Sequence, residues 1–151
     1  MKEILLAQGE VAVVDDEDYS RLSKYKWCCR SDGYVVRSTR VKGKSKTLYM
    51  HREILQTPEG MDTDHINHNK LDNQKTNLRA CTRAQNLYNQ KQKQNISGYK
   101  GVERVGQRWR AAIGIDGKYV RLGCFLNKED AARAYDHAAR GLFGEFASTN
   151  F

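Results

Sequence analysis

Long apolar runs are missing from this sequence. No stretch approaches the roughly 18 apolar residues that a membrane-spanning helix requires, and the mean hydropathy is -0.78. The segment from Met1 to Gln8 becomes polar too soon to form a secretory signal. We therefore expect no membrane partner, and a protein that works in the cytoplasm where it is made.

Spaced cysteine pairs are also missing. The four cysteines are Cys28, Cys29, Cys81 and Cys124, and none forms a C-x-x-C motif. Adjacent cysteines cannot easily serve one zinc ion, since zinc sites usually draw on spaced pairs. A disulfide scaffold is equally unexpected without secretion. The sequence predicts four free thiols and no zinc.

The charge is strongly uneven along the chain. Residues 1–18 carry a net charge of -5, residues 19–95 one of +10 and residues 96–151 one of +3, which together give +8. Between Arg21 and Arg52, ten basic residues and one acid are interleaved with Tyr25, Trp27, Tyr34 and Tyr49. Cations beside stacking rings suit a polyphosphate surface. Charge alone fits a solvated basic surface equally well.

A polar stretch near residue 95, Gln90–Gly98, is typical of a linker or a fraying helix end. Before it, short β-prone runs predict strands at Ile4–Ala7, Val11–Val14, Lys26–Arg30, Tyr34–Thr39 and Thr47–His51. A short helix is expected over Asp15–Leu22 and another after Thr82, a good N-cap. The fold class is therefore α+β, in two small modules.

The second module alternates clearly from Arg108 to Ile115. One face of this strand carries Trp109, Ala111, Ile113 and Ile115, and the other carries Arg108, Arg110, Ala112 and Gly114. After an Asp116-Gly117 turn, the return strand places Val120 and Leu122 inward and Tyr119 and Arg121 outward. A helix from Lys128 has an apolar stripe of Ala131, Ala134, Tyr135, Ala138 and Leu142. This pattern predicts a three-stranded antiparallel sheet backed by one helix.

The segment Met61–Asn73 is dense in metal ligands and proton-transfer groups. A carboxylate at a strand end, Asp64, and an amide on a helix, Asn86, suit one Mg²⁺ ion, which prefers oxygen donors. The adjacent imidazole of His65 can deprotonate a water molecule. Asp-His pairs are common and Asn-rich loops often only satisfy turns, so the spacing decides: Asn77 follows His65 by twelve residues, and Asn86 follows nine later.

At this spacing the sequence resembles the HNH homing endonucleases of phages and mobile introns, over about residues 47–90. The resemblance is carried by His51-Arg52, Asp64-His65-Ile66-Asn67, Asn69-Lys70, Asp72-Asn73, Asn77-Leu78-Arg79 and Asn86. It implies a ββα-metal fold, one divalent ion (Mg²⁺ or Mn²⁺) and cutting or nicking of double-stranded DNA. It matches His65 to the general base, Asp64 and Asn86 to the metal ligands, and Asn77 to the residue that braces the loop.

For three nearby residues the sequence is consistent with two roles each. His68 stands where relatives commonly have glycine; histidine tolerates the left-handed backbone, and a phosphate contact is a second possible role. His51 suits packing or a phosphate contact. Arg79 suits a phosphate ligand or a solvated arginine.

Residues 97–151 resemble the plant ethylene-response-factor (APETALA-type) DNA-binding domain. The matching segments are Ser97–Val102, Arg108-Trp109, Leu122–Phe125, Ala131–Asp136 and Asn150-Phe151. The resemblance implies that the sheet lies in the major groove, with five side chains toward DNA: Lys100, Arg108, Arg110, Tyr119 and Arg121. Glu103, Ala112, Gly114, Tyr119 and Arg121 differ from the plant residues that give base specificity, so the target sequence does not transfer.

Together these patterns predict a site-directed DNA endonuclease. Its nuclease domain spans 1–95, with the ββα-metal core at about 47–91, and its DNA-binding domain spans 96–151. We expect a monomer in the cytoplasm of a phage-infected or bacterial host cell. The rivals are a DNA-binding regulator with a vestigial HNH scaffold and a basic RNA-associated protein; the second explains the charge but not the metal constellation.

Overall fold

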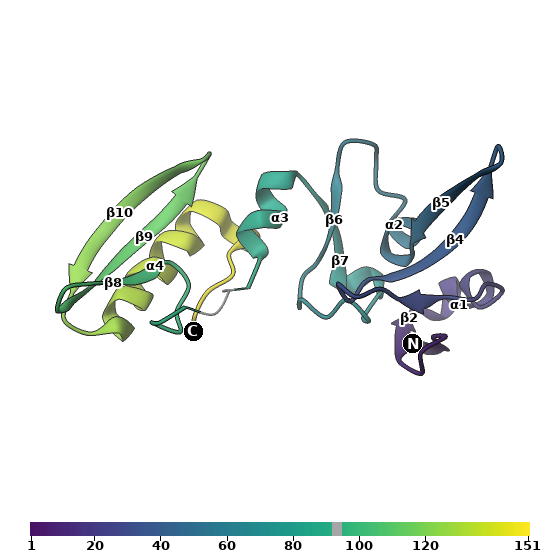
Figure 1. Ribbon diagram of the computed structural model, residues 1–151, viewed down its shortest axis with the longest axis horizontal. Coiled ribbons are helices and arrows are strands. Elements are labelled where there is room, and N and C mark those ends of the chain that lie inside the picture. The colour runs from purple at the N-terminus through teal and green to yellow at the C-terminus, as the bar shows by residue number, and fades with distance from the viewer. Residues whose placement is uncertain (92–94) are drawn as a thin grey trace. The chain divides into compact units, whose positions relative to one another are not determined.

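The chain forms two compact units, Met1–Arg83 and Ala84–Phe151, in a computed structural model that describes residues 1–91 and 95–151 (Figure 1). This division falls earlier in the chain than the polar stretch near residue 95. Residues 92–94 of the expected linker lie outside the described residues. Both units combine small antiparallel sheets with few helices, as the sequence predicts.

The first unit is built around short antiparallel ladders. β1 (Lys2–Leu5) pairs with β2 (Val11–Val14), and β6 (Asp62–His65) pairs with β7 (Leu78–Cys81). A three-stranded sheet has the order β3-β4-β5, formed by β3 (Cys28–Cys29), β4 (Val35–Val41) and β5 (Lys44–Tyr49). The β-prone runs of the sequence therefore become strands, with boundaries that differ by a few residues.

Helices α1 (Asp16–Leu22) and α2 (Met50–Leu55) connect these ladders. Three acidic side chains in the first turn of α1 stabilise this helix, because the helix dipole is positive at its N-terminus. The predicted strand Thr47–His51 is wrong at its end, because β5 stops at Tyr49 and His51 lies on α2. Helical spacing buries Met50, His51 and Ile54 on one face, whereas an extended chain would turn the adjacent Met50 and His51 to opposite faces.

One apolar core unites the elements of the first unit. Trp27 is 1% exposed, and its indole Nε1 donates to the Leu22 carbonyl at 2.9 Å. The core also includes Val14, Val35, Met50, Ile54 and Leu78. Because Leu78 belongs to β7, the core fixes one strand of the ladder that carries Asp64 and His65.

The N-terminal segment also holds the polar loop between β6 and β7. Val13 of β2 donates its amide to the Leu71 carbonyl at 2.8 Å and accepts from the Asn73 amide at 2.8 Å. The Asp15 carboxylate accepts from the Lys75 amide at 2.7 Å, at the start of the 3₁₀ helix η1 (Lys75–Asn77). The first residues of the chain therefore position the loop that follows His65.

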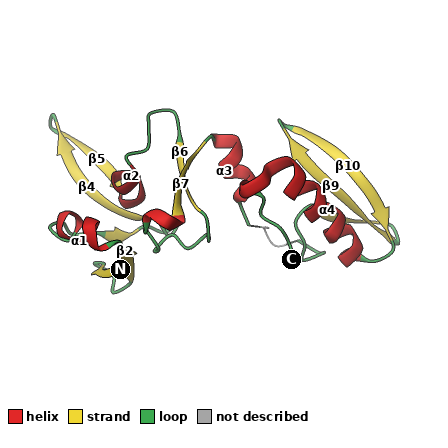
Figure 2. Ribbon diagram, turned by 180° about the vertical axis from the view of Figure 1, so that it is seen from behind, coloured by secondary structure: helices red, strands yellow, loops and turns green. Residues whose placement is uncertain are grey.

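The second unit is a three-stranded antiparallel sheet with one long helix, as predicted (Figure 2). Its strands are β8 (Val102–Val105), β9 (Arg108–Ile115) and β10 (Lys118–Phe125), in the order β10-β9-β8. Its helices are α3 (Arg83–Asn89), whose first residue ends the first unit, α4 (Lys128–Phe143) and the 3₁₀ turn η2 (Gly144–Phe146). In the described parts of the chain, no helix has the length and apolar character needed to cross a membrane.

Helix α4 packs on the face of β9 that carries Ala111 and Ile113, so the alternation predicted for β9 is confirmed. The predicted stripe of α4 is partly wrong: Leu142 is 53% exposed, and the buried face is Ala131, Ala132, Tyr135, Asp136 and Ala139. Val120, predicted inward, is 46% exposed. A register shift between Arg121 and Gly123 of β10 breaks the simple alternation there.

Gly101 is required where the chain enters β8. Its φ is +72°, and a Cβ at this position would lie 2.0 Å from the Tyr135 ring and 2.7 Å from the Ala112 carbonyl oxygen. Any side chain would therefore push the sheet away from α4. This close approach holds the residue before it, Lys100, at the edge of the sheet.

Candidate active site

Asp64 and Arg79 are paired across the β6–β7 ladder. Directly opposed residues of an antiparallel pair share a face, and Arg79 Nε and Nη2 donate to Asp64 Oδ2 at 2.9 and 2.8 Å. Both side chains are largely buried: Arg79 is 11% exposed and Asp64 is 8% exposed. The ion pair therefore fixes the orientation of the Asp64 carboxylate.

His65 follows on the same strand and is 4% exposed. Burial lowers its pKa below the usual value of 6.5, against opposing contributions from Asn73 and the Asp64 charge. The imidazole is therefore neutral at pH 7 and able to accept a proton.

Asn73 sets the orientation of the His65 ring. Its Oδ1 lies 3.4 Å from His65 Nε2, while its Nδ2 donates to the Lys70 carbonyl at 3.2 Å. With the amide nitrogen directed to Lys70, Oδ1 is an acceptor for Nε2–H, which makes Nδ1 the basic nitrogen of the ring. Asn73 is fully buried; it belongs to the quoted motif, but its spacing alone did not assign it this role.

Asn77 joins the two ends of the loop after His65. Its Oδ1 accepts from the Asn67 amide at 2.9 Å, and its Nδ2 donates to the Asp72 carbonyl at 2.8 Å. These are the contacts that a bracing residue would make. Within the loop His68 has φ +64°, so the left-handed backbone expected at this histidine is confirmed.

An aromatic cluster surrounds His65. The His51 and His65 ring centroids lie 5.1 Å apart with planes at 83°, and Tyr34 lies 5.1 Å from His51 and 6.0 Å from His65. Burial lowers the pKa of His51 to about 3, so this ring is neutral and packs rather than carrying charge. Tyr34 was visible in the sequence only as one aromatic of the basic run.

His51 also contains a buried nitrogen that the described residues do not satisfy. Its Nδ1 has no hydrogen-bond partner among them, although the residue is only 5% exposed. A buried unpaired polar atom costs stability. The contacts of His51 therefore favour the packing interpretation over a phosphate contact.

The expected second metal ligand, Asn86, lies on α3. Asp64 belongs to the first compact unit and Asn86 to the second. Among the described residues no group of three or more His, Cys, Asp or Glu side chains gathers around a metal position. A carboxylate and an amide are nevertheless a suitable donor set for Mg²⁺, which binds few protein oxygens and keeps several waters, and the Asp64 carboxylate lies beside a neutral imidazole.

The outward face of the second unit carries most of the expected DNA-contacting residues. Tyr119 is opposite Gly114, and Arg121 is opposite Ala112, so these side chains share the face that α4 leaves uncovered. Arg108 and Tyr119 are exposed, Tyr119 at 86%, and Arg110 is paired with Glu103 at 2.6 Å. The Arg121 guanidinium donates to Cys124 Sγ at 2.8 Å.

Lys100 has different contacts from those expected. Its ammonium donates to the carbonyls of Tyr88 at 2.7 Å and Gln90 at 2.6 Å. Burial lowers its pKa to about 8. In this structure the cation is bound at the C-terminal end of α3 rather than presented on the sheet face.

Comparisons with known proteins agree with this site. A family model described as HNH endonuclease matches residues 56–88, the segment that contains Asp64, His65, Asn77 and Asn86. The chain is 33% identical over 150 residues to an uncharacterised HNH endonuclease of Acanthamoeba polyphaga mimivirus, covering 95% of this chain and 76% of that protein.

Plant transcription factors match a shorter part. An ethylene-responsive transcription factor of Arabidopsis thaliana is 45% identical over 60 residues, which is 37% of this chain and 14% of that protein. One of Nicotiana tabacum is 50% identical over 56 residues, 35% of this chain and 25% of that protein. The chain thus spans only a small fraction of these plant proteins.

The matched segment and the ladder that carries its histidine define a nuclease, a hydrolase that acts on DNA. The chain belongs to the HNH endonuclease family. HNH nucleases typically use a divalent metal ion.

Proposed function

We propose that this protein is a site-directed endonuclease, similar to homing endonucleases, whose ββα-metal core is formed by β6, β7 and α3. His65 is its general base, Asp64 and Asn86 hold one divalent ion, and Asn77 braces the loop behind His65. The single observation that carries this proposal is the pairing of a buried, neutral His65 with an adjacent carboxylate that Arg79 holds in place.

The proton transfer follows from the contacts of His65. With Nε2–H directed to Asn73, Nδ1 takes a proton from the attacking water as the water oxygen bonds to phosphorus and the bond from phosphorus to the leaving oxygen of the DNA strand breaks. The resulting imidazolium is stabilised by the neighbouring Asp64 charge, which opposes the lowering of the His65 pKa by burial. A bound Mg²⁺ or Mn²⁺ would supply Lewis-acid stabilisation of the phosphate oxygens.

The second unit binds the target duplex through the sheet face opposite α4. Arg108, Arg110, Tyr119 and Arg121 contact DNA, mainly at phosphates, which position a protein without reading sequence. The role of Arg79 is to orient Asp64 rather than to bind a phosphate, because its guanidinium is bound to that carboxylate. The protein works as a monomer on double-stranded DNA.

Cleavage of a defined locus tests this function. Full-length protein and Mg²⁺ are incubated with supercoiled plasmid that carries the DNA flanking the gene, and with the same plasmid lacking that insert. We expect cuts or nicks at one mapped position in the insert. Equal, unmapped cutting of both plasmids would contradict site direction, and no cutting with either Mg²⁺ or Mn²⁺ would contradict the nuclease mechanism.

A further inference from the structure

Helix α3 packs within the second unit, although it carries the last residue of the HNH motif. From Ala84 onward it belongs to the compact unit that ends at Phe151, and it carries Asn86. Contacts with the sheet-and-helix unit therefore help to hold α3. Two of them lie at its C-terminal turn.

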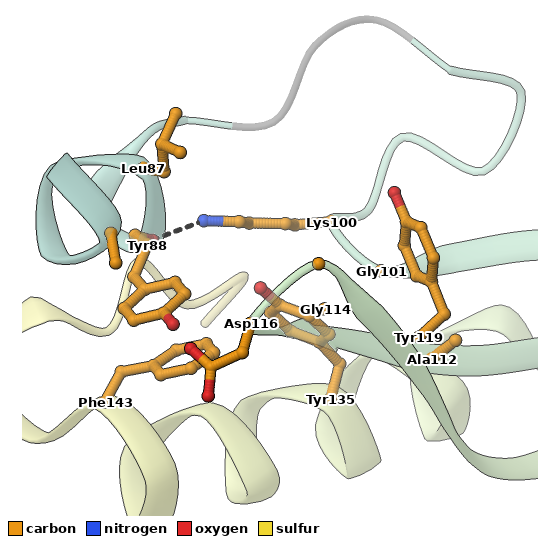
Figure 3. Close-up of a pocket in the computed structure, with 12 residues that line it drawn as sticks. Leu87, Tyr88, Lys100, Gly101, Ala112, Gly114, Asp116, Tyr119, Tyr135 and Phe143 are labelled. Atoms are coloured by element: carbon orange, nitrogen blue, oxygen red, sulfur yellow. Dashed lines mark hydrogen bonds between the residues drawn. The ribbon is translucent and has the colours of Figure 1, made fainter.

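The first contact is a stack of two rings. Tyr88 of α3 lies on Phe143, the last residue of α4, with ring centroids 3.8 Å apart and planes inclined by 8° (Figure 3). Paired aromatic rings contribute about 0.5–1.5 kcal/mol beyond the burial of their area. The stack therefore fixes the position of the last turn of α3 along α4.

The second contact is the ammonium of Lys100. It donates to the carbonyls of Tyr88 and Gln90, at the end of α3 where the helix dipole is negative. Figure 3 shows the hydrogen bond to Tyr88. The last four carbonyls of a helix have no hydrogen-bond partner inside the helix. The Lys100 ammonium therefore provides a donor to carbonyls at this end of α3. With a pKa of about 8, Lys100 is still mainly protonated at pH 7.

Lys100 is itself fixed to α4 through the C-terminal residues. Its backbone amide donates to Asn150 Oδ1 at 2.6 Å, and its carbonyl accepts from Asn150 Nδ2 at 3.2 Å. The Asn150 amide and Nδ2 in turn donate to the buried carboxylate of Asp136 at 2.8 and 2.9 Å. A continuous set of hydrogen bonds thus joins α4 to the end of α3.

One side of α3 borders an open pocket. A cavity of about 440 Å³ is lined by residues of α3, the sheet and α4, among them Leu87, Gly114 and Tyr119 (Figure 3). A continuous apolar interface would make each single contact unimportant. On the side of the cavity, α3 is instead tied to the sheet and to α4 by the Tyr88–Phe143 stack and by Lys100.

We propose that the DNA-binding unit also positions the metal-binding helix of the nuclease, with Tyr88, Lys100 and Phe143 as positioning residues for Asn86. This inference rests on the proposed role of Asn86 as a metal ligand. It assigns the second unit a part in metal binding in addition to contact with DNA.

The test uses full-length Phe143→Ala and Lys100→Met, with Lys100→Arg as the conservative variant. Leu142→Ala is the matched control, because Leu142 neighbours Phe143 on α4 and is 53% exposed. Three quantities are measured: hydrogen exchange of the amides of residues 87–90, Mn²⁺ affinity by electron paramagnetic resonance without DNA, and duplex affinity in EDTA.

We expect exchange of these amides to rise about tenfold in Phe143→Ala and Lys100→Met. Losing one such contact makes local opening of the end of α3 easier by about this factor. Mn²⁺ affinity should fall several-fold in both, Lys100→Arg should restore most of it, and Leu142→Ala should match the parent. Duplex affinity in EDTA should stay within about twofold of the parent.

Two results overturn the inference. Unchanged exchange in both variants would show that these contacts do not hold α3, and faster exchange with parental Mn²⁺ affinity would show that holding α3 does not position a ligand. Asn86→Ala separates this from the proposed function. If Asn86→Ala loses Mn²⁺ affinity while the positioning variants keep it, the inference alone fails; if Asn86→Ala keeps parental affinity, the ligand assignment fails and the inference with it.

Discussion

Asp64 and Arg79 form a buried ion pair across two adjacent strands, in which Nε and Nη2 of the guanidinium donate to Oδ2 of the carboxylate. Asp62, on the same strand β6, forms an exposed pair with Arg83 of α3 at 3.2 Å, in which the arginine side chain is 73% exposed. The two pairs share strand β6 and differ in burial. They therefore provide a matched comparison.

Arg79→Ala should destabilise the protein far more than Arg83→Ala. Removing one partner of a buried pair leaves an uncompensated charge and costs about 3 kcal/mol, whereas an exposed pair contributes less than about 1 kcal/mol. The free energy of unfolding from urea titration measures the difference. Equal losses in the two variants would show that the Asp64–Arg79 pair does not stabilise the site.

His51 should make the protein sensitive to acid. Its pKa is about 3 in the folded state and 6.5 in the unfolded state, so below pH 6.5 the unfolded chain binds more protons. Stability should therefore fall as pH decreases from 6.5, by up to about 1.4 kcal/mol per pH unit from this residue. His51→Phe, which keeps a ring in the cluster, should give a shallower decrease in unfolding free energy between pH 6.5 and pH 4. An unchanged slope would mean that His51 does not titrate as its burial requires.

Asp64→Ala and Asn86→Ala should lose cleavage in Mg²⁺ and recover part of it in excess Mn²⁺. Mn²⁺ is less demanding of geometry and tolerates a missing ligand better than Mg²⁺. Cleavage rates across a series of metal concentrations provide the measurement. Parental Mg²⁺ dependence in both variants would exclude these residues as ligands.

The sheet face of the second unit should determine the salt dependence of DNA binding. Replacing both Arg108 and Arg121 by alanine should reduce the slope of log affinity against log salt by about one to two, because each lost phosphate contact removes about one released counterion. Arg133→Ala removes the same kind of charge from α4 and serves as the control. A slope reduced equally by Arg133→Ala would show that binding is not directed to the sheet face.

The sequence predicted the α+β class and the strands because alternation and turn residues act locally. The bracing role of Asn77 came from the resemblance to HNH endonucleases, and it remains a prediction. The left-handed backbone of His68 follows from the same local reasoning.

Long-range packing explains what the sequence did not predict. His51 continues a β-prone run but lies on a helix, because Met50, His51 and Ile54 can be buried together on one face of a helix but not of a strand. The Asn73–His65 contact and the Tyr34 ring depend on how the loop and β4 pack, which no local pattern encodes. Lys100 matches a DNA-contacting position by resemblance, but this chain has an additional helix end nearby that binds its ammonium.

The most direct test of the catalytic assignment is single-turnover cleavage by His65→Ala beside the parent, with duplex binding measured in EDTA. Loss of a general base alone commonly reduces the rate by about 10²–10⁴, while affinity resides in contacts with phosphates. The account predicts a rate lowered by at least about a hundredfold and an affinity within a few-fold of the parent. Cleavage by His65→Ala at the parental rate would contradict it.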